Sequence, residues 1–213
     1  MNKLLTAALG AALAVASASA AAADGNGNGN GAFFINAGVG QAQYHVGRTD
    51  GLGYALDDKD TAGALRFGYM WHASQAFDLG IEGGYVDLGK VTADYNDGTY
   101  VAHADLGATG WMLGINGKYG FASHWYVSAR GGWLRSKGDL KASAYDNSTH
   151  QGGYLSGNGD GDGWYGGVGV GYDFAPSFSM GLNYDNYHAK AAQDGVSVHG
   201  NIGTYMVSAE YRF

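Results

Sequence analysis

Alternation between bulky apolar residues and small or polar residues runs from residue 32 to the last residue, and it constrains the fold more than any other feature of the chain. Residues 65–71, for example, read Leu-Arg-Phe-Gly-Tyr-Met-Trp. Successive side chains of a β-strand point to opposite faces, so this period of two predicts strands with one bulky apolar face and one small or polar face. Helices are disfavoured, because no 3.6-residue period is present and because 39 of the 213 residues are glycine.

The alternating segments predict an all-β fold of eight antiparallel strands, each about ten to thirteen residues long. Short and long connections alternate along the chain, so the strands run up and down and both ends of the strand region lie on the side of the short turns. The predicted short connections are 72–76, 121–124 and 175–177, and the predicted long ones are 46–61, 88–107, 137–162 and 189–200.

The face that is enclosed decides between two architectures. In a secreted β-sandwich the apolar faces pack inward, whereas in a transmembrane barrel they contact lipid and the small or polar faces fill the lumen. The strand length, the glycine-rich second face and the aromatic residues at the ends of the apolar faces favour an eight-stranded antiparallel up-and-down transmembrane β-barrel. The predicted membrane-interface aromatics are Trp71, Phe77, Tyr119, Trp125, Phe174 and Phe178 beside the short turns, and Trp111, Trp133, Trp164 and Tyr184 toward the long connections.

The first 23 residues have the three-part pattern of a secretory signal peptide. Lys3 provides a short basic region, residues 4–15 are apolar, and small residues follow. A membrane anchor is the alternative, but this apolar run is shorter than the ~20 residues that span a bilayer as a helix. We expect cleavage near residues 20–23, a flexible Gly/Asn-rich lead-in at 24–31 and a barrel over 32–213.

Several strand segments resemble those of the eight-stranded outer-membrane barrels of Gram-negative bacteria, namely the OmpA transmembrane domain and its OmpX- and Ail-like relatives. The resemblance covers residues 32–213 and is carried by 79–89, 117–120, 129–133 and the terminal Tyr211-Arg212-Phe213. It implies export to the outer membrane, with lipid and lipopolysaccharide as partners. It also implies biogenesis by the barrel-assembly machinery, which would read Tyr211 and Phe213 as an assembly signal.

Basic and acidic residues occur in nearly equal numbers on the predicted lumen face. Unpaired ions in a narrow, dry lumen are costly, so this balance predicts paired networks that hold the barrel together and close it. The OmpA resemblance implies a pair between Glu82 and Lys118. A narrow porin-like solute or ion channel is the alternative. The predicted network residues are Arg66, Asp78, Glu82, Lys118, Arg130, Asp173, Asp185, Glu210 and Arg212.

Sequence signals for catalysis or for a cofactor are weak. The chain has no cysteine, and the G-x-G-x-x-G at 161–166 lacks the preceding strand and following helix of a dinucleotide site. Segment 157–163 has the Gly and Asp of a calcium loop but not its full ligand spacing, so a surface loop is expected there. A lipid-A-modifying enzyme with Asp146, Ser148 and His150 near its outer rim is a further alternative. We expect no enzyme activity, no metal and no cofactor.

The long connections have the composition of a contact surface. Asp outnumbers Lys and Arg in them, and Tyr is interleaved with Gly, Ser and Asn, which suits adaptable contacts. The formal net charge of -7 argues against a nucleic-acid partner. We expect a structural and surface-display protein of the outer membrane, with adhesion or another host or environmental interaction through the long extracellular connections.

Overall fold

The computed structural model describes residues 31–44, 55–57, 59–193 and 196–213, and all regular structure in this part of the chain is β. In these residues no helix is long and apolar enough to cross a membrane. The predicted signal peptide and nearly all of the lead-in lie outside the described residues. The strands are β1 (Gly31–Tyr44), β2 (Ala55–Asp57), β3 (Lys59–His72), β4 (Phe77–Asn96), β5 (Tyr100–Ala122), β6 (Trp125–Asp146), β7 (Gln151–Ala175), β8 (Phe178–Gln193) and β9 (Val196–Arg212).

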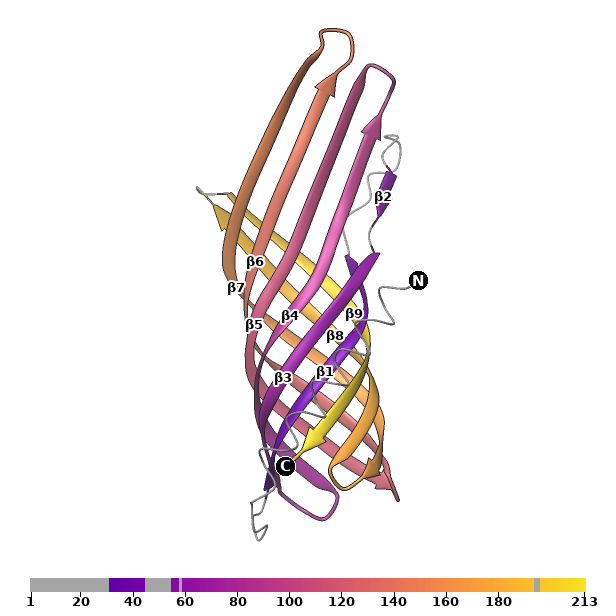
Figure 1. The fold of residues 1–213 in the computed structure, drawn as a ribbon. Coiled ribbons are helices and arrows are strands. Elements are labelled where there is room, and N and C mark those ends of the chain that lie inside the picture. The colour runs from indigo at the N-terminus through magenta and orange to yellow at the C-terminus, as the bar shows by residue number, and fades with distance from the viewer. Residues whose placement is uncertain (1–30, 45–54, 58, 194–195) are drawn as a thin grey trace.

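Eight of these strands form a closed antiparallel ring, which confirms the predicted barrel (Figure 1). Sequential strands pair with each other, and the ring closes where β1 pairs with β9, from Phe34 opposite Arg212 to Tyr44 opposite Ile202. The three-residue β2 stands outside the ring and pairs with β4 above the end of β3. Closure satisfies the backbone groups that the edges of an open sheet would leave exposed to lipid.

Side chains divide between the two faces as the alternation predicts. Leu65 and Phe67 on β3 point outward and are 49% and 58% exposed, whereas Arg66 between them is 1% exposed. A soluble sandwich would bury the apolar residues and expose the charged one. The observed orientation is that of a barrel whose outer surface contacts hydrocarbon.

Three of the predicted long connections are wrong, because they are mostly paired strand. The one predicted at 189–200 is the end of the β8–β9 ladder, which continues to Gln193 opposite Val196. The β4–β5 ladder continues to Asn96 opposite Val101, and the β6–β7 ladder continues to Asp146 opposite Gln151. The bulky alternation ends where the apolar band ends, and beyond it the strands continue with Ala, Gly and polar residues that the pattern did not identify. Figure 1 shows the β4–β5 and β6–β7 extensions rising past the other strands; we call residues 90–107 and 137–160 together with β2 the arm.

A β-bulge in β4 marks the base of the arm. Leu88 and Gly89 are inserted between Asp87, opposite Thr109, and Lys90, opposite Gly107. Gly89 has a φ of 73°, and its N–H donates to Oδ1 of Asp87 at 3.0 Å. The insertion reverses the alternation of β4, so that odd-numbered residues such as Val91 face inward in the arm.

Candidate functional sites in the lumen and on the arm

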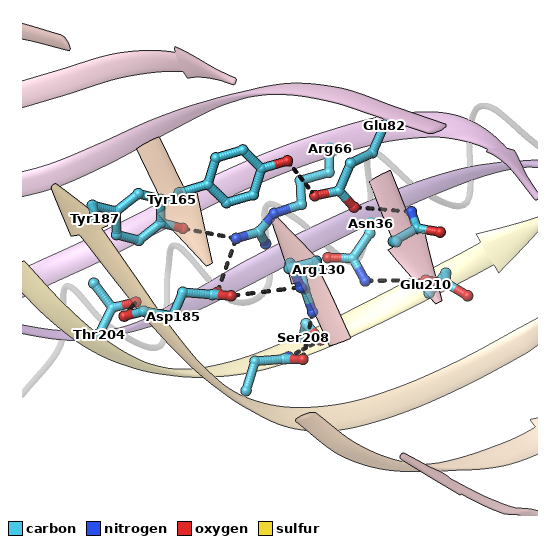
Figure 2. A network of polar contacts seen from close by, with 12 residues as sticks. Asn36, Arg66, Glu82, Arg130, Tyr165, Asp185, Tyr187, Thr204, Ser208 and Glu210 are labelled. Carbon is cyan, nitrogen blue, oxygen red and sulfur yellow. Dashed lines mark hydrogen bonds and ion pairs between the residues drawn. The ribbon is translucent and has the colours of Figure 1, made fainter. Parts of the chain in front are cut away.

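The lumen of the barrel is crossed by an ion pair that is almost completely buried. Arg66 on β3 donates from Nη2 to Oδ2 of Asp185 on β8 at 3.0 Å and to the hydroxyl of Tyr187 at 2.8 Å. The side chains of Arg66 and Asp185 are 2% and 0% exposed. Figure 2 shows these side chains reaching toward one another from different walls of the barrel. The pair therefore links strands that are not neighbours in the ring.

Arg130 on β6 extends this contact toward β9. Its Nε lies 3.5 Å from Oδ1 of Asp185, and its Nη2 donates to Oδ1 of Asn183 at 2.6 Å. Asn183 in turn donates to the hydroxyl of Ser208 at 2.7 Å. Two guanidinium groups thus share one carboxylate, while Nε of Arg66 and Oδ1 of Asp185 are buried without a hydrogen bond.

The carboxylate of Glu82 is held by neutral donors. Oε1 accepts from the hydroxyl of Tyr165 at 2.7 Å, and Oε2 accepts from Nδ2 of Asn116 at 2.9 Å. Among the described residues no basic side chain lies within ion-pair distance of Glu82. The pair with Lys118 that the resemblance implied is therefore wrong, because Asn116 and Tyr165 occupy the space that its ammonium group would need.

A second cluster closes the lumen nearer the short turns. Lys118 lies 2.7 Å from Oδ1 of Asp173, and Nη2 of Arg212 donates to the same oxygen at 2.6 Å. Lys118 Nζ also lies 3.8 Å from the centre of the Tyr126 ring. Glu210 completes the cluster through Arg212 Nε at 3.8 Å. Lys118 is thus paired with Asp173, whereas the resemblance implied a pair with Glu82.

Asp78 takes part in neither cluster. Its Oδ1 lies 2.6 Å from Nδ1 of His72 at the turn between β3 and β4, where the His72 side chain is 58% exposed. The other eight predicted network residues lie inside the barrel, seven of them in the two clusters and Glu82 with its neutral donors. Asn116, Asn183, Tyr165 and Tyr187 were not singled out from the sequence, although their inward positions in the alternating pattern could have identified them.

Glycines on the lumen face make room for the large network side chains. A methyl group on Gly167 would overlap the Asp185 carboxylate, and one on Gly114 would overlap the Tyr165 hydroxyl. Gly171 leaves space for the Tyr126 ring in the same way. The space over the glycines is therefore filled by large side chains from nearby strands, such as Asp185 directly opposite Gly167 and Tyr126 directly opposite Gly171. A small polar cavity of about 30 Å³ lies between the two clusters, and it is lined by Arg66, Glu82, Lys118 and Glu210 among others.

The ten predicted interface aromatics lie on the outer surface at the two ends of the apolar band. Beside the short turns, Phe77 is directly opposite Tyr119, and Trp125 packs against Tyr172 at a centroid distance of 5.3 Å. Toward the arm, Trp133 is directly opposite Trp164. Their role at the membrane interface stays a prediction, as does the role of Tyr211 and Phe213 in assembly.

The outer face of the arm carries a histidine between two carboxylates. His103 on β5 lies 2.6 Å from Oδ1 of Asp94 through Nδ1 and 3.4 Å from Oδ1 of Asp105 through Nε2. The hydrogen bond with Asp94, aided by the charge of Asp105, raises the pKa of His103 above its usual value of 6.5. Thr92 donates to Asp105 at 2.9 Å and lowers the pKa of that carboxyl. The cluster was missed from the sequence because the register that aligns β4 with β5 is not visible there.

The candidate catalytic residues at the tip of the arm form a turn. Asp146 Oδ1 accepts hydrogen bonds from the backbone N–H and the hydroxyl of Ser148 and from the N–H of Thr149. These bonds lower the pKa of Asp146 to about 2. His150 has a φ of 56° in the same turn. The carboxylate therefore fixes the turn and does not orient a histidine toward a nucleophile.

The predicted calcium-like loop at 157–163 is part of β7, which corrects the expectation of a surface loop there. Asp160 and Asp162 point outward and form ion pairs with Arg135 on β6. In the described part of the chain no group of three or more His, Asp or Glu side chains is arranged to hold a metal ion.

A closed ring of eight antiparallel strands, an apolar outer band and a lumen filled with ion pairs define an integral β-barrel of the outer-membrane type. The chain matches the family described as the outer membrane protein beta-barrel domain over residues 8–213. The protein belongs to this family, and membership places it in the Gram-negative outer membrane.

Solved outer-membrane proteins are similar to this chain over most of its length. Ail, the attachment invasion locus protein of Yersinia pestis, is 18% identical, with 86% of this chain and 99% of that chain covered and a TM-score of 0.49. OprG from Pseudomonas aeruginosa is 13% identical, with 88% and 98% covered and a TM-score of 0.47. Neisserial surface protein A is 9% identical, with 85% and 97% covered and a TM-score of 0.40. No curated protein sequence matches the chain.

Proposed function

We propose that the protein is a closed-lumen scaffold of the outer membrane that displays the arm to the cell exterior. The observation that carries this proposal is the pair of lumen clusters, built around Arg66 with Asp185 and around Lys118 with Asp173. Both lie across the path that a solute would follow. Opening such a path would strand buried charges, at a cost of several kcal/mol for each ion left unpaired.

Conductance of the purified protein in planar bilayers tests the closed lumen. We expect no stable steps beyond rare, small events, whereas large and long-lived steps would contradict the proposal and favour the narrow channel. A variant in which Arg66, Arg130 and Asp185 are all replaced by Ala provides a positive control. It removes both guanidinium groups together with the carboxylate that they share, and it should conduct more than the wild type.

The arm is the part of the protein suited to contacts outside the cell, because barrels of this type place their short turns in the periplasm. Host or environmental ligands and neighbouring lipopolysaccharide are its proposed partners. Arg135 and Lys137 lie just beyond Trp133 on the outer face of β6, at the height where lipid phosphates would meet the barrel. Attachment assays with cells that express the full protein or a protein without the arm test this role. Equal attachment by both would contradict it.

A further inference from the structure

The two edges of the arm differ. On one side β2 pairs with β4 from Ala55 opposite Asp94 to Asp57 opposite Thr92, so the chain itself covers the middle of this edge. On the other side β7 pairs with β6 down to Gln151, but its pairing with β8 reaches only to Asp160 opposite Ala192. In the described part of the chain no strand pairs with the outer edge of residues 151–159. Backbone N–H and C=O groups along about nine residues are left open to a further strand.

Within the described residues, this open edge has none of the features by which sheet proteins prevent pairing. Residues 151–159 read Gln-Gly-Gly-Tyr-Leu-Ser-Gly-Asn-Gly, with no charge and no proline. The β6–β7 register runs from Asp146 opposite Gln151 to Gly138 opposite Gly159 without a bulge. Edges that must not pair are usually protected by lysine, proline, a bulge or a covering loop. β2 covers part of the β4 edge, whereas the β7 edge at 151–159 can still accept a further strand.

From this asymmetry we propose that residues 151–159 pair with the same segment of a second copy of the protein, anchored in an opposing membrane. The occupant must be an extended, uncharged strand, because the edge offers backbone groups and small side chains and no ionic contacts. A second copy of 151–159 meets that description. Self-pairing about a two-fold axis is also the commonest closed arrangement of identical chains.

The direction of the strands decides which membrane holds the second copy. β7 descends from the tip of the arm into the barrel, so an antiparallel partner strand descends in the opposite direction and its barrel lies beyond the far end of the sheet. Antiparallel pairing is the pattern of the whole sheet and the more stable one per residue. Pairing centred on Leu155 would separate the Trp164 rows of the two barrels by roughly 60 Å along the strands.

The inner face of the arm supports the same arrangement. Leu155 lies directly opposite Ala142, which continues through Ala104 to Ala93 in one apolar row across four strands. With Tyr95 this row borders a shallow groove of about 430 Å³ on that face. A second copy added at β7 would continue the row through its own Leu155. The inference rests on the proposed display role of the arm and is independent of whether the lumen conducts.

Clustering of proteoliposomes tests the proposal. Phosphatidylcholine vesicles that carry the wild-type protein should grow in apparent size by light scattering at least several-fold over vesicles without protein. The double variant Tyr154→Lys/Ser156→Lys, which places like charges along the edge, should abolish this growth. The control Ser143→Lys adds one lysine on the same face one strand inward, opposite Tyr154 and beside the native Lys141 that lies opposite Ser156. It should cluster like the wild type.

Three outcomes would overturn the proposal: no clustering by the wild type, equal clustering by the edge variant, or equal capture of vesicles that contain no protein. Single cysteines add a test of direction, because the chain has none of its own. In a scan of positions 151–159, disulfide cross-links should peak at one or two adjacent positions, as antiparallel pairing requires. Equal cross-linking at every position would indicate parallel pairing within one membrane and would contradict the proposal. Heat-modifiable migration in gels verifies that each variant is folded, and conductance reports separately on the closed lumen.

Discussion

A single buried carboxylate organises the upper half of the lumen. Asp185 is the ion-pair partner of both Arg66 and Arg130, and its side chain is fully buried. Replacing Asp185 with Asn keeps the shape but leaves two guanidinium groups without their anion. We expect a loss of about 3–5 kcal/mol in the free energy of unfolding, measured by urea titration in lipid vesicles.

The exposed ion pairs of the arm provide a control for that measurement. Asp160 pairs with Arg135 where both side chains are about half exposed, so Asp160→Asn should cost less than about 1 kcal/mol. Similar losses in the free energy of unfolding for the two variants would show that burial does not increase the contribution of the Asp185 pair to stability.

Close packing against glycine sets a second test at single residues. A methyl group at Gly167 would overlap the Asp185 carboxylate, whereas one at Gly153, on the same strand in the arm, would meet nothing within 4 Å. Gly167→Ala should therefore destabilise the barrel by about 1–3 kcal/mol, and Gly153→Ala should be nearly neutral. Thermal unfolding followed by heat-modifiable gel migration compares the two, and a neutral Gly167→Ala would mean that the network moves aside freely.

At the scale of elements, the β4–β5 hairpin of the arm should respond to pH. His103 has a raised pKa, so protonation stabilises the folded hairpin fully below pH 6.5, and this contribution is lost as the pH rises through the folded pKa. Hydrogen exchange at the amides of residues 92–105, corrected for intrinsic rates, should reveal more frequent opening above that pKa. The change should disappear in His103→Gln, which keeps a donor but cannot titrate.

The sequence predicted the strands inside the apolar band but not their extensions into the arm. Around Phe67 and Arg66 lipid and lumen impose opposite chemistry on alternate residues, so the pattern identified the strand and its orientation. Around Ala104 and Ala142 water meets both faces, the pattern fades, and paired strands were predicted as loops. The partners of Glu82 also could not be predicted, because they depend on which walls face each other across the lumen.

For the whole molecule, barrel and arm should be separable. Every residue of the two lumen clusters lies on the barrel side of the bulge at Gly89. If the arm were removed, the β4–β5 ladder would end at Lys90 opposite Gly107 and the β6–β7 ladder at Gly138 opposite Gly159. A variant with Asn-Gly turns in place of 91–106 and 139–158 should still fold. We expect heat-modifiable migration and a closed lumen like those of the full protein; failure to fold in lipid would show that the arm is needed to build the barrel.

The pairing of β1 with β9 affects when the barrel can fold. Phe213 donates its N–H to the carbonyl of Phe33, and Asn36 contacts Glu210, which is 174 positions away in the sequence. β1 can pair with β9 only after the whole chain has been exported. The barrel therefore cannot close while the chain is still being exported. Contacts this distant in sequence form slowly. We therefore expect the chain to need chaperones that prevent its apolar hairpins from aggregating until β9 can pair with β1.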